Sequence, residues 1–149
     1  MSLLVVSHHP QRTQSDCLPV CAQMVTDYLG LPLSYSHLVK RLGTRSFGTP
    51  FRNIKELEKD SFAVIIGHMN LAEIRRYLTA QLPVLAGVHT ADLSYWSQAV
   101  DHMVVVIGVD DSFVYVNDPS LVAGRHPIPH VEFELAQLGF DQLCAVLHR

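Results

Sequence analysis

The sequence predicts an α+β fold in which N-terminal helices pack on one side of a C-terminal antiparallel sheet. Apolar residues recur at helical spacing through most of the first half of the chain. The second half holds short runs rich in β-branched residues, and turn-forming residues separate them. The length of 149 residues and the hydrophobic fraction of 48% suit a single domain, residues 1–149, with a substantial core.

The predicted helices begin and end at residues that favour a helix boundary. Serine, aspartate and asparagine cap helix starts through their side chains, proline favours the first helical position, and glycine stops a helix. Asn70 and Glu73 together have the spacing of a capping box. The predicted helices cover residues 16–29, 34–42, a segment that begins at 49–50, 70–79 and 131–138. The residues that favour their starts include Asp16, Ser34, Pro50 and Asn70. Gly30 and Gly43 end the first two helices.

Short apolar runs predict the strands of the sheet. The strongest is 102–109, and the turn residues 110–112 connect it to 113–118, so these two runs are expected to form a hairpin. The segment 126–130 contains two prolines, and we therefore expect neither a helix nor a regular strand there. The predicted strands are 62–67, 83–88, 102–109, 113–118 and 142–148.

Composition excludes several classes of function. The net charge is −3 and the basic residues do not gather, so no nucleic-acid partner is expected. No apolar run approaches the roughly 20 residues that span a bilayer, so we expect no membrane insertion of this chain. Three cysteines without a framework spacing suit a reducing compartment, which predicts a cytoplasmic location.

Cys17 is the candidate nucleophile. It follows Asp16, the expected cap of the first helix, and so falls in the first helical turn. A structural thiol is expected further along, on the apolar stripe, where Cys21 lies. The positive end of a helix favours the thiolate form of a cysteine, which is the reactive form.

A cysteine nucleophile needs a base and a group that orients the base. His102 begins the strongest strand and Asp118 ends its hairpin partner, so the two are expected roughly opposite each other, with Cβ atoms about 4.5–5.5 Å apart. Asp118 could then orient the imidazole. Trp96, six residues before His102, is predicted as either a cleft wall or a buried anchor of its loop. His126 and His130 lack a ligand set at zinc spacing, so neither a metal nor another cofactor is expected.

These motifs resemble those of the papain-like peptidases that remove double-glycine leaders from bacteriocins, usually as the N-terminal domain of ABC exporters. The family pattern is a glutamine, an acidic–cysteine pair opening a helix, a histidine starting a strand and an Asp-Pro pair ending the next. The matching residues are Gln11, Asp16-Cys17, His102 and Asp118-Pro119. The resemblance implies a papain-like fold and a cysteine peptidase that forms an acyl-enzyme. It also implies that Gln11 donates to the oxyanion, with Gln14 as the second choice.

The resemblance further implies a peptide or protein substrate such as a leader peptide, no cofactor, and a separate ABC exporter as partner. The chain has neither transmembrane helices nor an ATPase domain, so we expect a free-standing relative or a domain separated from an exporter. Leu18 stands where the family commonly has glycine, and we expect it to reshape the pocket beside the thiol. Two alternatives stay open: a non-catalytic peptide-binding module, against which Cys17, His102 and Asp118 argue, and a cysteine acyltransferase or amidase, which shares the acylation step.

Overall fold

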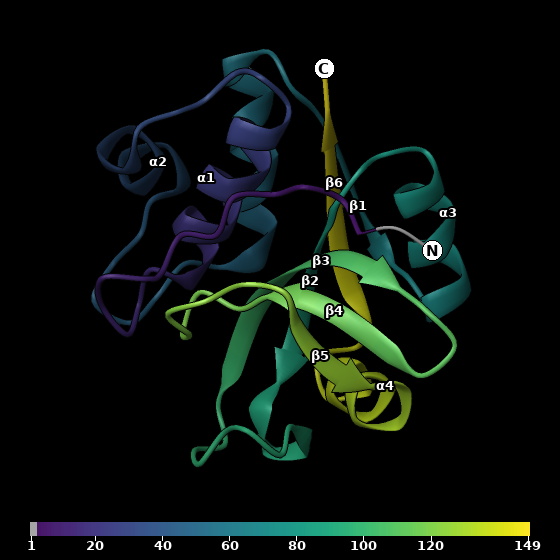
Figure 1. The fold of residues 1–149 in the computed structure, drawn as a ribbon. Coiled ribbons are helices and arrows are strands. Elements are labelled where there is room, and N and C mark those ends of the chain that lie inside the picture. The colour runs from purple at the N-terminus through teal and green to yellow at the C-terminus, as the bar shows by residue number, and fades with distance from the viewer. Residues whose placement is uncertain (1–2) are drawn as a thin grey trace.

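The computed structural model describes residues 3–149, which form a six-stranded antiparallel sheet covered by helices (Figure 1). The strand order is β1-β6-β2-β3-β4-β5, and every neighbouring pair is antiparallel. The strands are β1 Ala63–His68, β2 Val84–His89, β3 Asp101–Val109, β4 Phe113–Asn117, β5 His126–Pro129 and β6 Leu143–His148.

The helices start close to the predicted residues. Ser34 accepts a hydrogen bond from the His37 amide at 3.2 Å, and Asn70 forms a complete capping box with Glu73. The third helix is a 3₁₀-helix, in which Pro50 lies just before the first turn instead of within it. The helices are α1 Cys17–Tyr28, α2 Tyr35–Leu42, η1 Phe51–Asp60, α3 Leu71–Thr79, η2 Thr90–Asp92 and α4 His130–Leu138.

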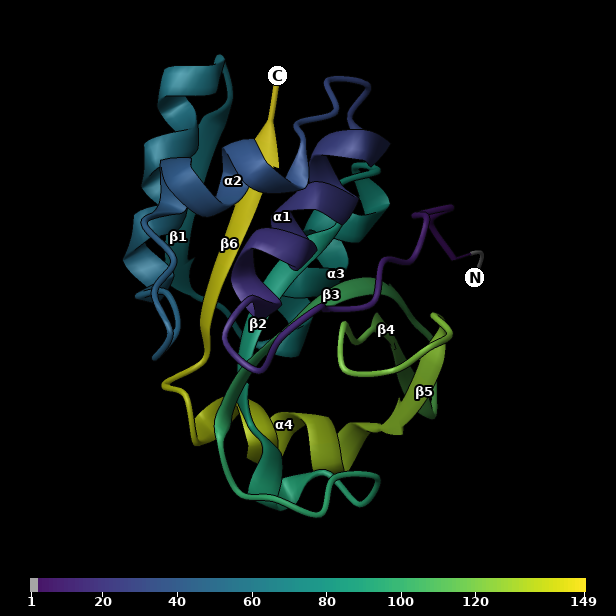
Figure 2. The same cartoon turned by 90° about the vertical axis from the view of Figure 1, so that its left-hand side faces the viewer.

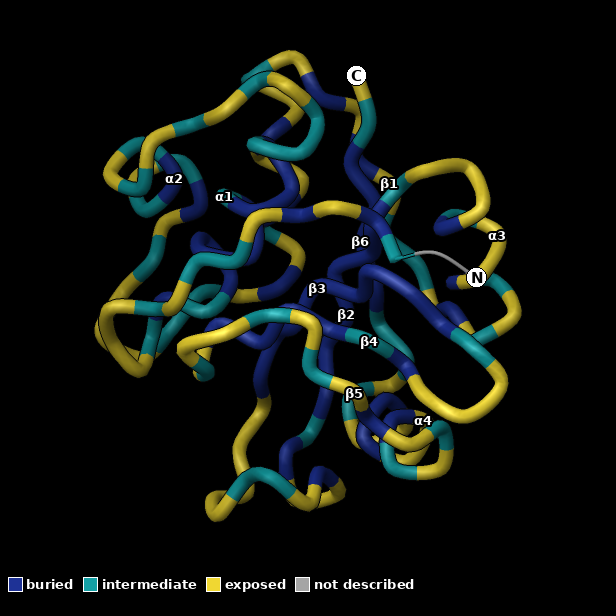
Figure 3. Tube along the Cα trace, viewed as in Figure 1, coloured by how far each residue is buried: buried dark blue, intermediate teal, exposed yellow. Residues whose placement is uncertain are grey.

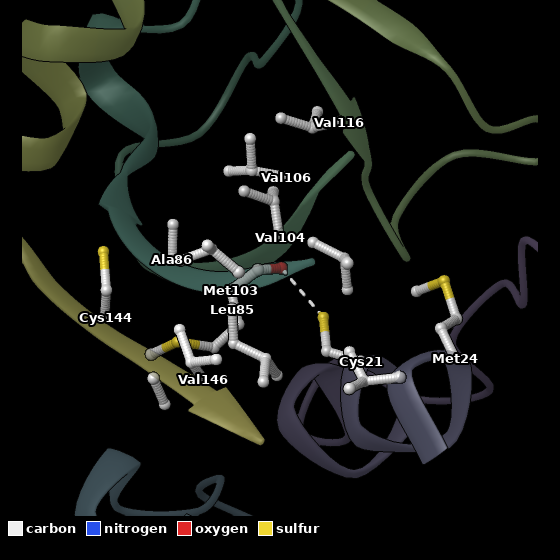
Figure 4. Packing of buried hydrophobic residues seen from close by; sticks show 14 of the residues in the cluster. Cys21, Met24, Leu85, Ala86, Met103, Val104, Val106, Val116, Cys144 and Val146 are labelled. Atoms are coloured by element: carbon white, nitrogen blue, oxygen red, sulfur yellow. Dashed lines mark hydrogen bonds between the residues drawn. The ribbon is translucent and has the colours of Figure 1, made fainter. Parts of the chain in front are cut away.

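The N-terminal helices α1, α2 and η1 lie on one side of the sheet, as predicted, whereas α3 and α4 pack on the other (Figures 1 and 2). Figure 4 shows Cys21 and Met24 of α1 facing the sheet, where the Cys21 thiol donates to the Met103 carbonyl at 3.5 Å. On the opposite side the Gln137 amide of α4 donates to the Cys144 sulfur at 3.5 Å. The middle of the sheet is therefore buried from both sides, and the exposed residues gather in loops and on outer helix faces (Figure 3).

The strand β5 contradicts the expectation for residues 126–130. His126–Pro129 pairs with β4, with Pro127 beside Tyr115 and Pro129 beside Phe113. The reason is the position of β5 at the edge of the sheet, where alternate residues need not donate to a neighbour. Proline lacks only that donor, so two prolines at alternate positions leave the pairing with β4 possible.

Apolar helices long enough to cross a bilayer are absent from residues 3–149.

Gly87 in β2 gives a test of the packing between the sheet and the chain after α4. A Cβ atom at Gly87 would come within 2.1 Å of the Phe140 ring, so Gly87→Ala should destabilise the protein by about 1–3 kcal/mol. Gly67→Ala in β1 is the matched control, because its nearest neighbour would be 4.0 Å away. Denaturant unfolding measures both, and equal stabilities for the two variants would contradict the packing described here.

Candidate active site

Cys17 is the one partly exposed thiol among the three free cysteines, all of which lie within residues 3–149. It is the first residue of α1, whereas Cys21 and Cys144 have no solvent exposure. Burial raises the pKa of Cys21 well above its ordinary value and raises the pKa of Cys144 to about 12. The two core thiols are therefore held protonated, and Cys17 is the thiol that a reactant can reach.

Asp16 occupies the N-cap position of α1, but its side chain does not cap the helix as predicted. The buried carboxylate turns back instead and accepts hydrogen bonds from the Arg12 amide at 3.0 Å, the Thr13 amide at 3.2 Å and the Tyr35 hydroxyl at 2.7 Å. Asp16 therefore shapes the loop before Cys17. The first amides of the helix keep the orientation that favours an anion near the thiol.

Leu18 does not shape the pocket beside the thiol, contrary to expectation. Its side chain is 1% exposed and belongs to the core. Pro19 follows in the first helical turn, where its missing amide proton costs no intrahelical hydrogen bond. The Leu18-Pro19 pair thus anchors and starts α1, and leaves Cys17 at the surface.

His102 and Asp118 form a buried hydrogen-bonded pair. The Nε2 atom of His102 donates to Oδ1 of Asp118 at 2.7 Å, and the two side chains are 4% and 0% exposed. This leaves Nδ1 as the ring nitrogen available to Cys17. Burial alone would lower the pKa of His102, but hydrogen bonds to Asp118 and Cys17 and the charges of these two groups raise it to about 9.

The predicted hairpin of β3 and β4 is present, but its predicted register is wrong. Val105 pairs with Asn117, so Asp118 stands level with Val104 and diagonally across from His102. The register comes from the turn, where Val109 pairs with Val114; the irregularity between Val106 and Gly108 places one additional residue on β3 and so moves Asp118 from opposite Val105 to opposite Val104, one residue nearer His102 and on the same face. Diagonal neighbours are still within reach of a long side chain, which explains how the imidazole contacts Asp118.

The carboxylate of Asp118 accepts five hydrogen bonds from the part of the chain that the structure describes. The other donors are the Ser120 amide at 2.8 Å and hydroxyl at 2.7 Å on Oδ1, and the Tyr95 hydroxyl at 2.6 Å and Trp96 Nε1 at 3.1 Å on Oδ2. Burial raises the pKa of Asp118, but the bond and charge of His102 and these donors lower it below its ordinary value. A fully buried carboxylate is in this way kept ionised.

Two adjoining depressions meet at Cys17. The first, of about 270 Å³, lies between Cys17 and His102 and includes Trp96 in its wall. The second, of about 290 Å³, continues past Cys17 and is lined mainly by apolar groups, Phe51, Met103 and Phe140 among them. Phe47, which is largely exposed, borders both. An extended chain could therefore pass over the thiol from one depression to the other.

Gln11 and Gln14 both line the depression that contains Cys17 and His102. The Gln11 amide nitrogen donates to the Thr13 carbonyl at 2.7 Å, which leaves its second N–H free within the described residues. The backbone amide of Gln11 donates to the Pro119 carbonyl at 2.7 Å and so ties this segment to the turn that carries Asp118. Geometry alone allows either glutamine to donate to an oxyanion.

Sequence reasoning missed Tyr95, Ser120 and Phe47. The Asp-Pro-Ser order was a usable signal for Ser120, because aspartate commonly accepts from the amide two residues later. Tyr95 and Phe47 lie in loops, and no periodicity predicts where a loop side chain points. Trp96 lines the first depression, as one of its two predicted roles requires; it is partly buried, and its indole also attaches its loop to Asp118.

Across residues 3–149, no three histidine, cysteine, aspartate or glutamate side chains gather as a metal site would need. The group around Asp118 contains one histidine and otherwise hydroxyl, indole and amide donors. These donors already occupy both carboxylate oxygens. The arrangement suits proton transfer and nucleophilic attack by a thiol.

The sequence matches the family described as the Peptidase C39 family over residues 6–136. No curated protein matches the sequence.

Three solved structures with similar folds are peptidases. A C39-like peptidase from Bacillus anthracis has a TM-score of 0.82 and 13% identity, over 100% of this chain and 98% of that chain. The peptidase domain of ComA from Streptococcus, a bifunctional ABC transporter involved in quorum sensing, has a TM-score of 0.76 and 19% identity, over 96% and 98%. A double-glycine motif protease from an AMS/PCAT transporter, in complex with the leader peptide, has a TM-score of 0.74 and 17% identity, over 98% and 93%.

The different exposure of the three thiols predicts selective alkylation. Iodoacetamide at mildly acidic pH should modify Cys17 in the folded protein, because only this thiol is both accessible and next to His102. Cys21 and Cys144 should react only after unfolding, and peptide mapping by mass spectrometry reports all three. Equal labelling of the three in the folded protein would contradict the assignment of Cys17 as the reactive thiol.

Proposed function

The chain belongs to the Peptidase C39 family and is a cysteine-type peptidase, and we propose that it cleaves peptide bonds through a triad of Cys17, His102 and Asp118. The observation that carries this proposal is that Cys17 and His102 line one depression while a buried carboxylate holds the other side of the imidazole. These are the nucleophile, the base and the orienting group that thiol catalysis needs.

In this mechanism the resting pair is a Cys17 thiolate beside a His102 imidazolium. The raised pKa of His102, about 9, supports this pair, because the imidazole then keeps its proton at neutral pH. The start of α1 adds the favourable field of the helix dipole at the sulfur. The thiolate attacks the carbonyl carbon of the scissile peptide bond and forms a bond from sulfur to carbon.

The attacked carbonyl oxygen becomes an oxyanion in the tetrahedral intermediate. We propose two donors for it: the backbone amide of Cys17, which has no partner within its own helix, and the side chain of Gln11, which lines the same depression. When the intermediate collapses, His102 gives its proton to the leaving amine and a thioester remains on Cys17. A water molecule then attacks the thioester while His102 takes its proton, and hydrolysis restores the starting pair.

The substrate we propose is a leader peptide that ends in a double glycine. The two depressions that meet at Cys17 support an extended peptide that crosses the thiol. A solved structure with a similar fold is a double-glycine motif protease in complex with the leader peptide, and another is the peptidase domain of an ABC transporter. By the same likeness, we propose a separate ABC exporter as the partner of this chain.

Trapping the acyl-enzyme tests the proposed function. Two synthetic peptides would be used that differ only before the cleaved bond, one with Gly-Gly and the other with Val-Val. Acid quenching followed by mass spectrometry should find the N-terminal part of the Gly-Gly peptide on Cys17, because a thioester is stable in acid long enough to be detected. The Val-Val peptide should leave Cys17 unmodified.

Cys17→Ala and His102→Ala are the controls for this experiment. Release of the leader fragment by Cys17→Ala would contradict the proposed nucleophile, and equal acylation by both peptides would contradict the double-glycine specificity. An acyl group that passes to an added amine in preference to water would identify an acyltransferase, because the two activities share the thioester.

The two glutamines give a further prediction. Gln11→Ala should leave Cys17 alkylation nearly unchanged, because the helix and His102, and not the amide, determine the charge of the sulfur. Its kcat should nevertheless fall by about 10²–10³, as for the loss of one oxyanion donor in a well-studied protease. Gln14→Ala should cost much less. If both variants are folded and Gln14→Ala has the lower kcat, Gln14 and not Gln11 is the oxyanion donor.

A further inference from the structure

The loop between η2 and β3 donates hydrogen bonds to Oδ2 of Asp118, the carboxylate oxygen that His102 does not contact. Oδ1 of Asp118 accepts from His102 and Ser120, whereas the donors to Oδ2 among residues 3–149 are Tyr95 at 2.6 Å and Trp96 at 3.1 Å. The partners of the two oxygens are therefore separate. One oxygen holds the imidazole, and the other depends on this loop for all of its hydrogen bonds.

The same loop is braced so that these two donors stay in place. Thr90 is buried, and its hydroxyl donates to the Gln98 carbonyl at 2.6 Å and accepts from the Val100 amide at 2.9 Å, which closes the loop at its base. The Ser94 amide donates to Glu132 of α4 at 2.9 Å. The Tyr95 ring lies 4.1 Å from the ring of His126 in β5. Both ends and one side of the loop are thus attached to the sheet and to α4.

Trp96 makes a second contact beyond its hydrogen bond. Its ring centroid is 4.7 Å from that of His102, and it lines the depression beside Cys17. The indole therefore contacts both His102 and Asp118 beside the depression, and the two side chains of that pair are only 4% and 0% exposed. Charges attract each other more strongly where water is excluded, because the effective dielectric constant is lower.

We propose that Tyr95 and Trp96 are positioning residues, which fix the Asp118 carboxylate with Oδ1 toward His102 and keep water from the bond between them. This inference rests on the proposed function, since it concerns the same triad. Without the two donors, Oδ2 would be a buried charged oxygen with no partner, which is unfavourable. The carboxylate would then turn, or water would enter, and its hold on His102 would weaken.

Few other charged or titratable groups face the pair of His102 and Asp118. Cys17 and Cys21 of α1 interact with His102 and Asp118 respectively, and Asp16 interacts with Cys21. Glu132 of α4 acts on Tyr95, whose pKa is raised by burial and by the charge of Asp118, so its hydroxyl stays protonated and able to donate. None of these groups is altered by changing the hydroxyl of Tyr95 or the indole nitrogen of Trp96.

The test uses the double variant Tyr95→Phe/Trp96→Phe, which keeps an aromatic ring at each position and removes both donors. Tyr115→Phe is the matched control, because the Tyr115 hydroxyl also donates to a carboxylate, that of Asp110, at 2.6 Å but away from Cys17. The probe is iodoacetamide, and the rate of Cys17 alkylation is measured against pH. Thermal unfolding shows that each variant is folded, and the single variants Tyr95→Phe and Trp96→Phe replace the double variant if it is not.

The alkylation rate should rise in a final step as His102 loses its proton, near pH 9 in the unaltered protein. In the double variant the midpoint of this step should move to a pH about one unit lower, because a carboxylate that is loosely held raises the pKa of His102 less. Tyr115→Phe should keep the step in place. A step that stays in place or moves upward in the folded double variant would overturn the inference.

Failure of the proposed function would look different. If His102→Ala has the same alkylation profile as the unaltered protein, His102 does not act on Cys17 and the triad is wrong. If His102→Ala removes the final step but the Tyr95 and Trp96 variants keep it, the triad stands and only the positioning role is lost.

Discussion

The ionised carboxylate of Asp118, buried without solvent contact, is the constraint on which the rest of the site depends. A buried charge persists in a protein only where hydrogen bonds and an opposite charge replace water. Here the donors come from three separate segments: β3 through His102, the loop before β3 through Tyr95 and Trp96, and the turn after β4 through Ser120. Satisfying this one group therefore brings all three segments to the start of α1.

Different contacts within the fold position the thiol of Cys17 and the base His102. Core packing of α1, with Leu18 and Cys21 fully inside, leaves the first residue of the helix near the beginning of β3, where Cys17 and His102 line the same depression. The N-terminal segment is tied to the same place, because the Gln11 amide donates to the Pro119 carbonyl. Nucleophile, base and candidate oxyanion donor thus converge through contacts between segments that are distant in the sequence.

The sequence predicts those parts of the site that local patterns control. The apolar periodicity of the first helix and the hairpin turn place Cys17 at a helix start and Asp118 at a strand end, although Asp16 does not cap the helix through its side chain. The exact register of the hairpin was not predicted, since it depends on which residues pair at the turn, Val109 with Val114, and on the irregularity between Val106 and Gly108, neither of which the sequence pattern specifies. The partners of Asp118 in the loop before β3 and the edge strand β5 depend on tertiary contacts, which periodicity does not contain.

The central claim is that Asp118 keeps His102 protonated beside Cys17 at neutral pH, and an NMR titration of the His102 ring nitrogens tests it most directly. The account predicts a pKa of about 9 in the unaltered protein. It also predicts a clear decrease in Asp118→Asn, because a neutral amide no longer stabilises the imidazolium. A His102 that titrates near 6.5, the ordinary value for histidine, in both proteins would contradict the account.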